Sequence, residues 1–182
     1  MKKLFILFIL LSFCGNVFSQ KENTVISIGN KENPISKTET FYENGQLKYS
    51  KVITGFNRFA EIKTYYENGQ LESEGNRAFS GKNVGVWKWY YENGQLELIQ
   101  NWKKGKKHGK AMWYYENGQL MQDENWSFGK EDGVFKWYYE NGQLDEEGFF
   151  RKGKAEGVWK HYDNNGTLSQ VRHFKKGKEI KN

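Results

Sequence analysis

Apolar and polar positions alternate along most of this chain with a period of two, and short polar turns interrupt the alternation at regular intervals. In the stretch Gly85–Tyr91, the odd positions hold Trp87, Trp89 and Tyr91, and the even positions between them hold valine, lysine and tyrosine. This alternation is typical of a strand with two different faces. A second strand-like run follows the polar turn Glu92–Gln95. The pattern therefore predicts antiparallel strand pairs, and no window favours a helix.

The turn recurs as the sequence Tyr-Tyr-Glu-Asn-Gly-Gln-Leu or a close variant. Its central glycines are Gly45, Gly69, Gly94, Gly118, Gly142 and Gly166, so the steps are 24, 25, 24, 24 and 24 residues. A fixed period of this size indicates a repeat architecture. Asn-Gly between apolar runs predicts a two-residue type I′ turn, with positive φ at both residues. The longer step predicts a bulge or a longer turn between Leu71 and Gly81.

A second type of turn, Gly-Lys-x-x-Gly, alternates with the first, as in Gly105–Gly109. Two glycines four residues apart favour a longer hairpin connection. Together the two turns predict an all-β fold, an elongated antiparallel β-hairpin repeat in one twisted sheet. Aromatic side chains on one face are expected to stack from repeat to repeat as its core. The last strand, Leu168–Phe174, is expected to leave an open edge guarded by Lys175 and Lys176.

The N-terminus has the form of an export signal. Lys2 and Lys3 precede the apolar run Leu4–Phe13, which is too short to span a bilayer, and a cleavage site lies between Ser19 and Gln20. This predicts a signal peptide at residues 1–19, an N-terminal linker or cap at residues 20–40, and repeats with a C-terminal tail at residues 41–182. The expected location is secreted, or periplasmic and cell envelope.

The only cysteine, Cys14, leaves a lipoprotein signal as an alternative, which the bulky Phe13 before it disfavours. Cleavage after Ser19 would leave a chain without thiols or disulfides. Removing Met1–Ser19 takes away two lysines, so the charge falls from +6 to +4. Such a small excess does not indicate specific nucleic-acid binding.

The repeat resembles a known family. Gly85–Leu96 with Gly105–Gly109, and Gly133–Leu144 with Gly153–Gly157, are similar to the bacterial variant of the MORN repeat. The resemblance covers roughly Phe41–Lys178 and implies a rod of β-hairpins. Proteins with such repeats act as scaffolds and as membrane- or partner-binding modules, and some bacterial relatives are labelled antitoxins. A cytosolic neutraliser would not need an export signal, which argues against that role here.

Residues for catalysis are scarce. His108, His161 and His173 are scattered and suggest no Ser-His-Asp group and no metal-ligand spacing, so a structural or surface role is expected for all three. The sequence therefore predicts a non-enzymatic protein without catalytic residues, a metal or a cofactor.

Two sets of residues are candidates for binding. The densest basic cluster contains Lys103, Lys104, Lys106, Lys107 and Lys110, and the aromatic rungs include Trp89, Trp113 and Trp137. The lysines suit an anionic lipid or glycan; alternatively, they have no binding role and belong to a solvated turn. The tryptophans suit sugars or a quaternary ammonium, and the bland alternative is the core of a thin sheet.

These observations predict an exported, non-enzymatic repeat protein that acts as a scaffold binding a protein or an envelope component. One alternative is a ligand-binding module for cell-surface glycans or choline-type groups. The other is an antitoxin-like inhibitor of a toxin partner.

Overall fold

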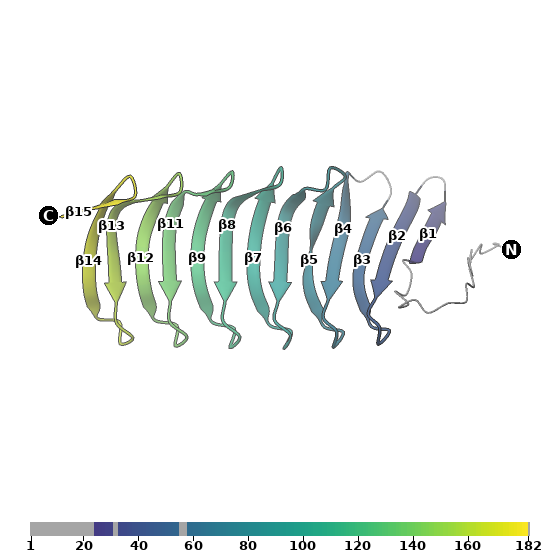
Figure 1. Ribbon diagram of the computed structural model, residues 1–182, viewed down its shortest axis with the longest axis horizontal. Coiled ribbons are helices and arrows are strands. Elements are labelled where there is room, and N and C mark those ends of the chain that lie inside the picture. The colour runs from purple at the N-terminus through teal and green to yellow at the C-terminus, as the bar shows by residue number, and fades with distance from the viewer. Residues whose placement is uncertain (1–23, 31–32, 55–57, 182) are drawn as a thin grey trace, which may run out of the picture.

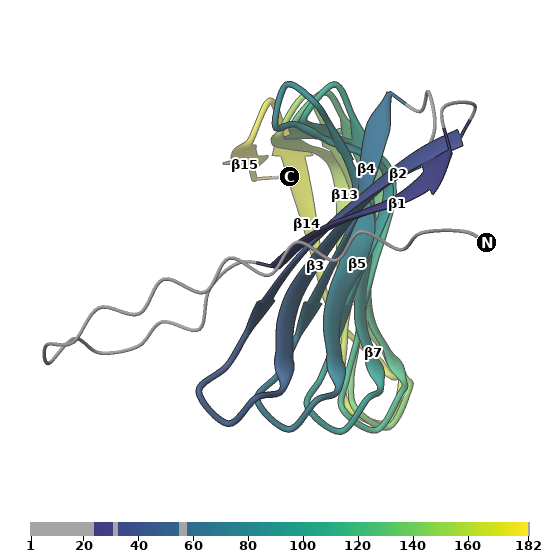
Figure 2. The same ribbon diagram turned by 90° about the vertical axis from the view of Figure 1, so that its right-hand side faces the viewer.

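The computed structural model describes residues 24–30, 33–54 and 58–181, so the predicted signal peptide lies outside the described residues. The described chain forms one 15-stranded antiparallel sheet, in which the strands follow one another in chain order and β10 pairs with β9 beside that path (Figure 1). No part of the described chain is helical, which confirms the all-β prediction. Figure 2 shows a single bowed layer with turns along both edges.

The strands are short and of similar length. They are β1 (Thr24–Asn30), β2 (Asn33–Phe41), β3 (Leu47–Thr54), β4 (Phe59–Tyr65), β5 (Leu71–Ala78), β6 (Asn83–Tyr90), β7 (Leu96–Lys103), β8 (Lys106–Tyr114), β9 (Leu120–Ser127), β10 (Lys130–Glu131), β11 (Gly133–Tyr138), β12 (Leu144–Arg151), β13 (Lys154–Tyr162), β14 (Leu168–Lys175) and β15 (Lys178–Ile180).

The Glu-Asn-Gly-Gln connections line one edge, which we call the glutamate edge. In the connection between β6 and β7, the N–H of Gly94 donates to the Tyr91 carbonyl and the N–H of Tyr91 donates to the Gln95 carbonyl, both at 2.8 Å. Gly94 has φ of 85°, whereas Asn93 is not among the residues with positive φ. The loop is therefore a three-residue connection that ends in a left-handed glycine. The predicted two-residue type I′ turn is wrong here.

The Lys-Gly turns line the other edge, which we call the lysine edge. Lys104 and Gly105 both have positive φ, at 54° and 78°, and the flanking residues Lys103 and Lys106 pair directly. This is the tight two-residue hairpin that the sequence predicted for the opposite edge. The second glycine of the motif, Gly109, lies where the pairing register shifts. The predicted longer connection is thus wrong, because it is a tight turn followed by a bulge.

The 25-residue step has a local cause. Between β5 and β6, the N–H of Gly81 donates to the Ala78 carbonyl and the N–H of Ala78 donates to the Lys82 carbonyl, both at 2.8 Å. Phe79–Gly81 thus form a loop one residue longer than its equivalents, as predicted. At the C-terminal end, β15 pairs with the last three residues of β14. The predicted open edge at Leu168–Phe174 is therefore partly covered.

The apolar core lies on one face of the sheet, called the core face here. Towards the N-terminal end, Ala60, Ile62 and Trp87 are buried, and Trp89 and Trp102 pack against them. Towards the C-terminal end, the ring of Trp159 lies 4.9–5.9 Å from three phenylalanine rings, those of Phe135, Phe150 and Phe174. One aromatic face therefore runs along the repeats, as the alternation predicted.

The opposite face carries alternating charges. Lys88 faces Glu74 at 3.7 Å, Lys110 faces Asp123 at 3.0 Å and Lys160 faces Glu147 at 3.2 Å. These side chains are partly exposed, so each pair adds only a fraction of a kcal/mol, about 0.2–1. Valines between them are exposed, among them Val134 and Val158. The opposite face is thus the wetter of the two.

Candidate binding surface

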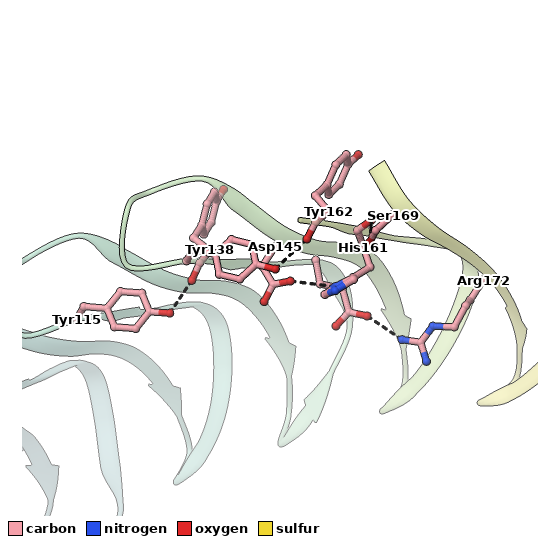
Figure 3. A network of polar contacts seen from close by, with 9 residues as sticks. Tyr115, Tyr138, Asp145, His161, Tyr162, Ser169 and Arg172 are labelled. Carbon is pink, nitrogen blue, oxygen red and sulfur yellow. Dashed lines mark hydrogen bonds and ion pairs between the residues drawn. The ribbon is translucent and has the colours of Figure 1, made fainter. Parts of the chain in front are cut away.

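The tyrosines of the repeated turn join each repeat to the next. Tyr91 donates its hydroxyl hydrogen to the Tyr114 carbonyl at 2.7 Å, one repeat further along. The same bond occurs from Tyr42 to Tyr65, Tyr66 to Tyr90, Tyr115 to Tyr138 and Tyr139 to Tyr162. Figure 3 shows the bond from Tyr115. We call this series the tyrosine spine. Partial burial raises the pKa of Tyr91 and of Tyr115, so the spine donors stay protonated beyond the usual range.

Asparagine and glutamine of the same turn also serve the repeat contacts. Asn117 Oδ1 accepts from the Gln119 N–H at 2.9 Å, and Asn117 Nδ2 donates to the Glu140 carbonyl of the next repeat at 3.2 Å. Gln119 Oε1 lies so close to Gly142 that a Cβ there would be 2.6 Å from it. The tyrosine and asparagine of the repeated motif therefore have structural roles, and its glutamate side chain is exposed to solvent.

The spine ends in the last repeat. Asp163 stands where the other repeats have the donating tyrosine, and its Oδ1 accepts from the N–H groups of Asn165 and Thr167 at 2.9 and 2.8 Å. A carboxylate has no hydroxyl hydrogen to donate to a further repeat. The tyrosine spine therefore ends at Asp163, whose side chain accepts hydrogen bonds within its own turn.

A polar network lies beside this last turn (Figure 3). His161 Nδ1 lies 2.9 Å from Asp145 Oδ1, and Ser169 lies close by. However, the Ser169 hydroxyl donates to the backbone carbonyl of His161 at 3.0 Å and not to its imidazole. A nucleophilic serine needs the imidazole as its proton acceptor, so this arrangement does not form a catalytic triad. The network links β12 to β13 and β14 through the side chains of Asp145, His161 and Ser169.

At the centre of the core face, a glycine on one strand makes room for a tryptophan ring on the neighbouring strand. In β5 and β6, Gly75 lies under the Trp87 ring, where a Cβ would be 2.3 Å from Trp87 Cδ2. In β12 and β13, Gly148 lies under the Trp159 ring in the same way, at 2.2 Å. An indole therefore fills the space that a neighbouring side chain would need. We call these two places the glycine–tryptophan zones.

A row of side chains runs across the strands through these two zones. The repeats between the two zones have different side chains in this row, and we call this part of the core face the middle zone. Gln100 pairs with Ala111, and Ala111 pairs with Glu124. Gln100 is fully buried and Glu124 is 3% exposed. A long polar side chain beside a small alanine thus replaces glycine beside tryptophan. Gln100 Nε2 donates to the Asn101 carbonyl at 2.9 Å, while Gln100 Oε1 has no protein partner.

Glu124 is a buried carboxyl group with an altered affinity for protons. Burial raises its pKa above the usual value of 4.5, and nearby Glu131 adds to the rise. Trp126 Nε1 donates to Glu124 Oε1, and Gln122 Nε2 donates to Glu124 Oε2 at 2.9 Å; these bonds and the charge of Lys107 oppose the rise without cancelling it. The hydrogen bonds therefore hold the Glu124 carboxyl group in place. Because its pKa is raised, it ionises at a higher pH than an exposed glutamate.

Lys107 turns inward beside this carboxyl group. Its Nζ lies 4.3 Å from the ring centroid of Trp126 and 5.5 Å from that of Trp113, within the range of cation–π attraction. A ligand cation would take this position in an aromatic cage. The choline-type site is therefore already filled at this place by the chain's own ammonium group.

The structure separates the predicted binding residues. It brings Lys107 and Trp113 together, whereas Lys110 lies on the opposite face with Asp123 and Trp89 stacks on Trp87 in the core. The exposed side chains of Lys103, Lys104 and Lys106 line the lysine edge, and Trp137 lies half-buried in β11. Alternation explains the split between Lys107 and Lys110, because these residues lie three positions apart in β8 and so point to opposite faces of the sheet.

Sequence reasoning missed Gln100 and Glu124. A signal was present for Glu124, because it lies two residues before Trp126 and so shares a face with this aromatic residue under strand alternation. In the described part of the chain, no group of three or more histidine, cysteine or acidic residues could hold a metal ion. Nor does any helix among those residues have the length and apolar character to cross a membrane.

An array of hairpins, each tied to the next by the same hydrogen bonds, defines a β-hairpin repeat protein. The chain belongs to the MORN repeat variant family, which confirms the resemblance seen in the sequence. The family model matches residues 37–51, 60–77, 83–104, 107–127, 131–152 and 155–176. The first match begins within β2.

A search of the curated proteins found no match. Among solved structures, the chain is similar to a porin-like protein from Bacteroides uniformis, at 12% identity. The match covers 86% of this chain and 90% of that chain, with a TM-score of 0.21. A likeness at this level does not bear on the function of this chain.

Proposed function

We propose that this protein is an exported, non-enzymatic scaffold that binds a protein or another envelope component through its middle zone. The observation that carries the proposal is the burial of Gln100 and Glu124 in the row that tryptophan fills elsewhere. The turn motif is less suited to recognition, because its tyrosine and asparagine already donate hydrogen bonds to the next repeat.

The middle zone buries an acidic group, which the glycine–tryptophan zones do not, although Trp159 Nε1 in one of those zones also has no hydrogen-bond partner. A buried carboxylate with a raised pKa and an unpaired amide oxygen each weaken a fold, by about 1–3 kcal/mol for an unsatisfied polar group. Natural proteins depart from consistent packing mainly at functional sites. A polar interruption in an otherwise aromatic face is therefore a candidate for selection by binding.

The chemistry of the middle zone suits a protein surface. Trp113 and Trp126 are half-buried, so part of each indole faces solvent, and Lys107 lies beside them. Tryptophan is enriched among the residues that contribute most of the binding energy at protein interfaces. Export rests on the sequence of Met1–Ser19 alone, and the absence of catalytic function is part of the proposal.

The proposal can be tested by affinity capture with the processed chain from envelope extract of its own source. A Lys107→Gln variant removes the inward ammonium, and Lys160→Gln removes a lysine of the opposite face as the matched control. We expect Lys107→Gln to lose a partner that the wild type and Lys160→Gln both retain. Equal recovery of that partner by all three proteins, with unchanged thermal unfolding, would overturn the assignment of the middle zone.

A further inference from the structure

A row of lysines runs along the lysine edge through all the well-formed repeats. One lysine follows the glycine of each turn at this edge, and the set is Lys82, Lys106, Lys130, Lys154 and Lys178. All five are exposed. Each repeat contributes two strands about 4.8 Å apart, so equivalent lysines recur about every 10 Å along the sheet. The sequence showed one dense basic cluster, and in the fold Lys106 of that cluster is part of a longer line.

Contacts with the next turn hold the stems of these lysines in line. A Cβ built on Gly105 would lie 2.9 Å from Lys82 Cγ, and one built on Gly177 would lie 3.5 Å from Lys154 Cβ. The lysine stem therefore lies over the glycine of the following repeat. Ordering of the stem in the free protein lowers the entropy lost when the ammonium groups bind a ligand.

A second line of side chains follows the first. The preceding turn position, which has positive φ, holds Lys104, Lys152 and Lys176, and in one repeat Phe128. The Phe128 ring lies 4.5 Å from the His108 ring and 5.8 Å from Lys103 Nζ, and it is 49% exposed. The lysine edge thus combines a row of cations with an exposed aromatic ring.

Lysines outnumber the acidic residues beside the lysine edge, which are Glu131, Asp132, Glu156 and Glu179, and the glutamates of the repeated turn stand at the other edge. Glu43, Glu67, Glu92, Glu116 and Glu140 stand one per repeat along the glutamate edge, and all are exposed. Within the described residues, none of the five row lysines has an ion-pair partner. A modest net charge therefore hides a strong separation, in which one edge is cationic along its length.

We propose that the lysine edge binds a linear acidic polysaccharide that lies along the long axis of the sheet. A line of evenly spaced cations fits a single extended polyanion, whose charges also recur at a fixed spacing. A flat anionic bilayer would meet the edge only along one line and leave most of its charge unmatched. The exposed Phe128 ring supplies a flat apolar surface for the face of a sugar ring.

This surface differs from the proposed contact in the middle zone. The row lysines belong to the turns at the edge of the sheet, whereas Lys107 points towards Trp113 and Trp126 on the core face. The two proposals therefore fail independently. A Lys107→Gln variant is expected to keep its polysaccharide affinity.

The test compares two variants of equal net charge. The edge variant replaces Lys82, Lys106, Lys130 and Lys154 by glutamine, and the face variant replaces Lys88, Lys110, Lys136 and Lys160 by glutamine. Polygalacturonate is the acidic probe and dextran the neutral one, and affinity is measured by calorimetry at several salt concentrations. Thermal unfolding of each protein shows whether it is folded.

We expect wild type to bind polygalacturonate with an affinity that falls as salt rises, and not to bind dextran. The edge variant should bind at least about tenfold more weakly with a shallower salt dependence, whereas the face variant should bind like wild type. Equal losses in both variants would show that net charge alone is sensed. That result would overturn the proposal, as would the absence of binding or tighter binding to single-stranded DNA or anionic vesicles.

Discussion

The glycine–tryptophan zones and the middle zone fill the same row of one sheet in opposite ways. Trp87 and Trp159 cover a glycine on the neighbouring strand, and the middle zone sets the long side chains of Gln100 and Glu124 against Ala111. The backbone pairing around them is the same. Neighbouring strands therefore share one volume between them, and a repeat can change its side chains only if its neighbour changes too.

The glycine–tryptophan zones contribute mainly to stability, whereas the middle zone is the proposed binding surface. In the glycine–tryptophan zones the row is filled by apolar surface, which favours folding. In the middle zone it is filled by polar groups, one of which ionises reluctantly. The tyrosine spine runs unchanged through both, so its hydrogen bonds do not depend on which side chains fill the row.

The largest effect is expected from removing the tryptophan of a glycine–tryptophan zone. Trp159→Ala should lower the free energy of unfolding by about 3–5 kcal/mol, because the indole contacts three phenylalanine rings. Ala111→Gly in the middle zone should cost only about 1–2 kcal/mol. Urea unfolding followed by fluorescence measures both, and an equal loss would contradict the comparison.

Adding one methyl group should have the next largest effect. Gly148→Ala places a Cβ 2.2 Å from the Trp159 ring, so the indole must move, at a cost of about 1–3 kcal/mol. Gly75→Ala should behave alike, because its Cβ would meet Trp87 at 2.3 Å. Neither glycine has positive φ, so backbone strain does not contribute. Unchanged thermal midpoints in both variants would show that the row is loosely packed.

Removing one tyrosine hydroxyl of the spine should lower the free energy of unfolding by the same amount in every zone. Tyr115→Phe removes the hydroxyl that donates to the Tyr138 carbonyl and should cost about 0.5–1.5 kcal/mol. Tyr91→Phe, which lies nearer the N-terminal zone, should cost the same within error. Tyr114→Phe is the control, since its hydroxyl reaches only the weak acceptor Met112 Sδ at 3.7 Å. A cost at Tyr114 as large as at Tyr115 would argue against the spine.

The smallest effects concern pH, and they have opposite signs in two glutamates. Burial raises the pKa of Glu124, so its contribution to stability is lost as pH rises from about 4.5 through the raised pKa. Although partial burial raises the pKa of Glu147, hydrogen bonds from Lys160 and Tyr162 outweigh it and lower the pKa, so its contribution is lost as pH falls below about 4.5.

Unfolding at pH 3, 5 and 7 separates these two groups. Relative to wild type, Glu124→Gln should gain stability as pH rises, and Glu147→Gln should lose stability as pH rises from 3. Parallel pH profiles of the two variants would contradict the assigned environments.

The fold could be predicted from sequence because its signals are local and repeated. The period gave the repeats, and alternation within single strands identified the aromatic face. The turn types were exchanged between edges, because Asn93 accepts a hydrogen bond from the Gln95 N–H and does not need positive φ. A dipeptide preference does not include that side-chain contact.

The candidate surfaces could be predicted only in part. Lys107 and Trp113 were named, but Glu124 and Gln100 gain meaning only from the cross-strand register. The basic cluster around Lys104 was treated as one surface, whereas alternation along β8 already separates Lys107 on the core face from Lys110 on the opposite face. Register and bulges depend on pairing between strands, which alternation within one strand does not specify.

The shared volume between neighbouring strands can be measured directly by a double-mutant cycle. Gly75→Gln and Trp87→Ala together rebuild the Gln100–Ala111 pair in a glycine–tryptophan zone. The account predicts that the double variant is less destabilised than the sum of the single variants, by at least about 1 kcal/mol in the free energy of unfolding. Single effects that add to within about 0.5 kcal/mol would contradict it.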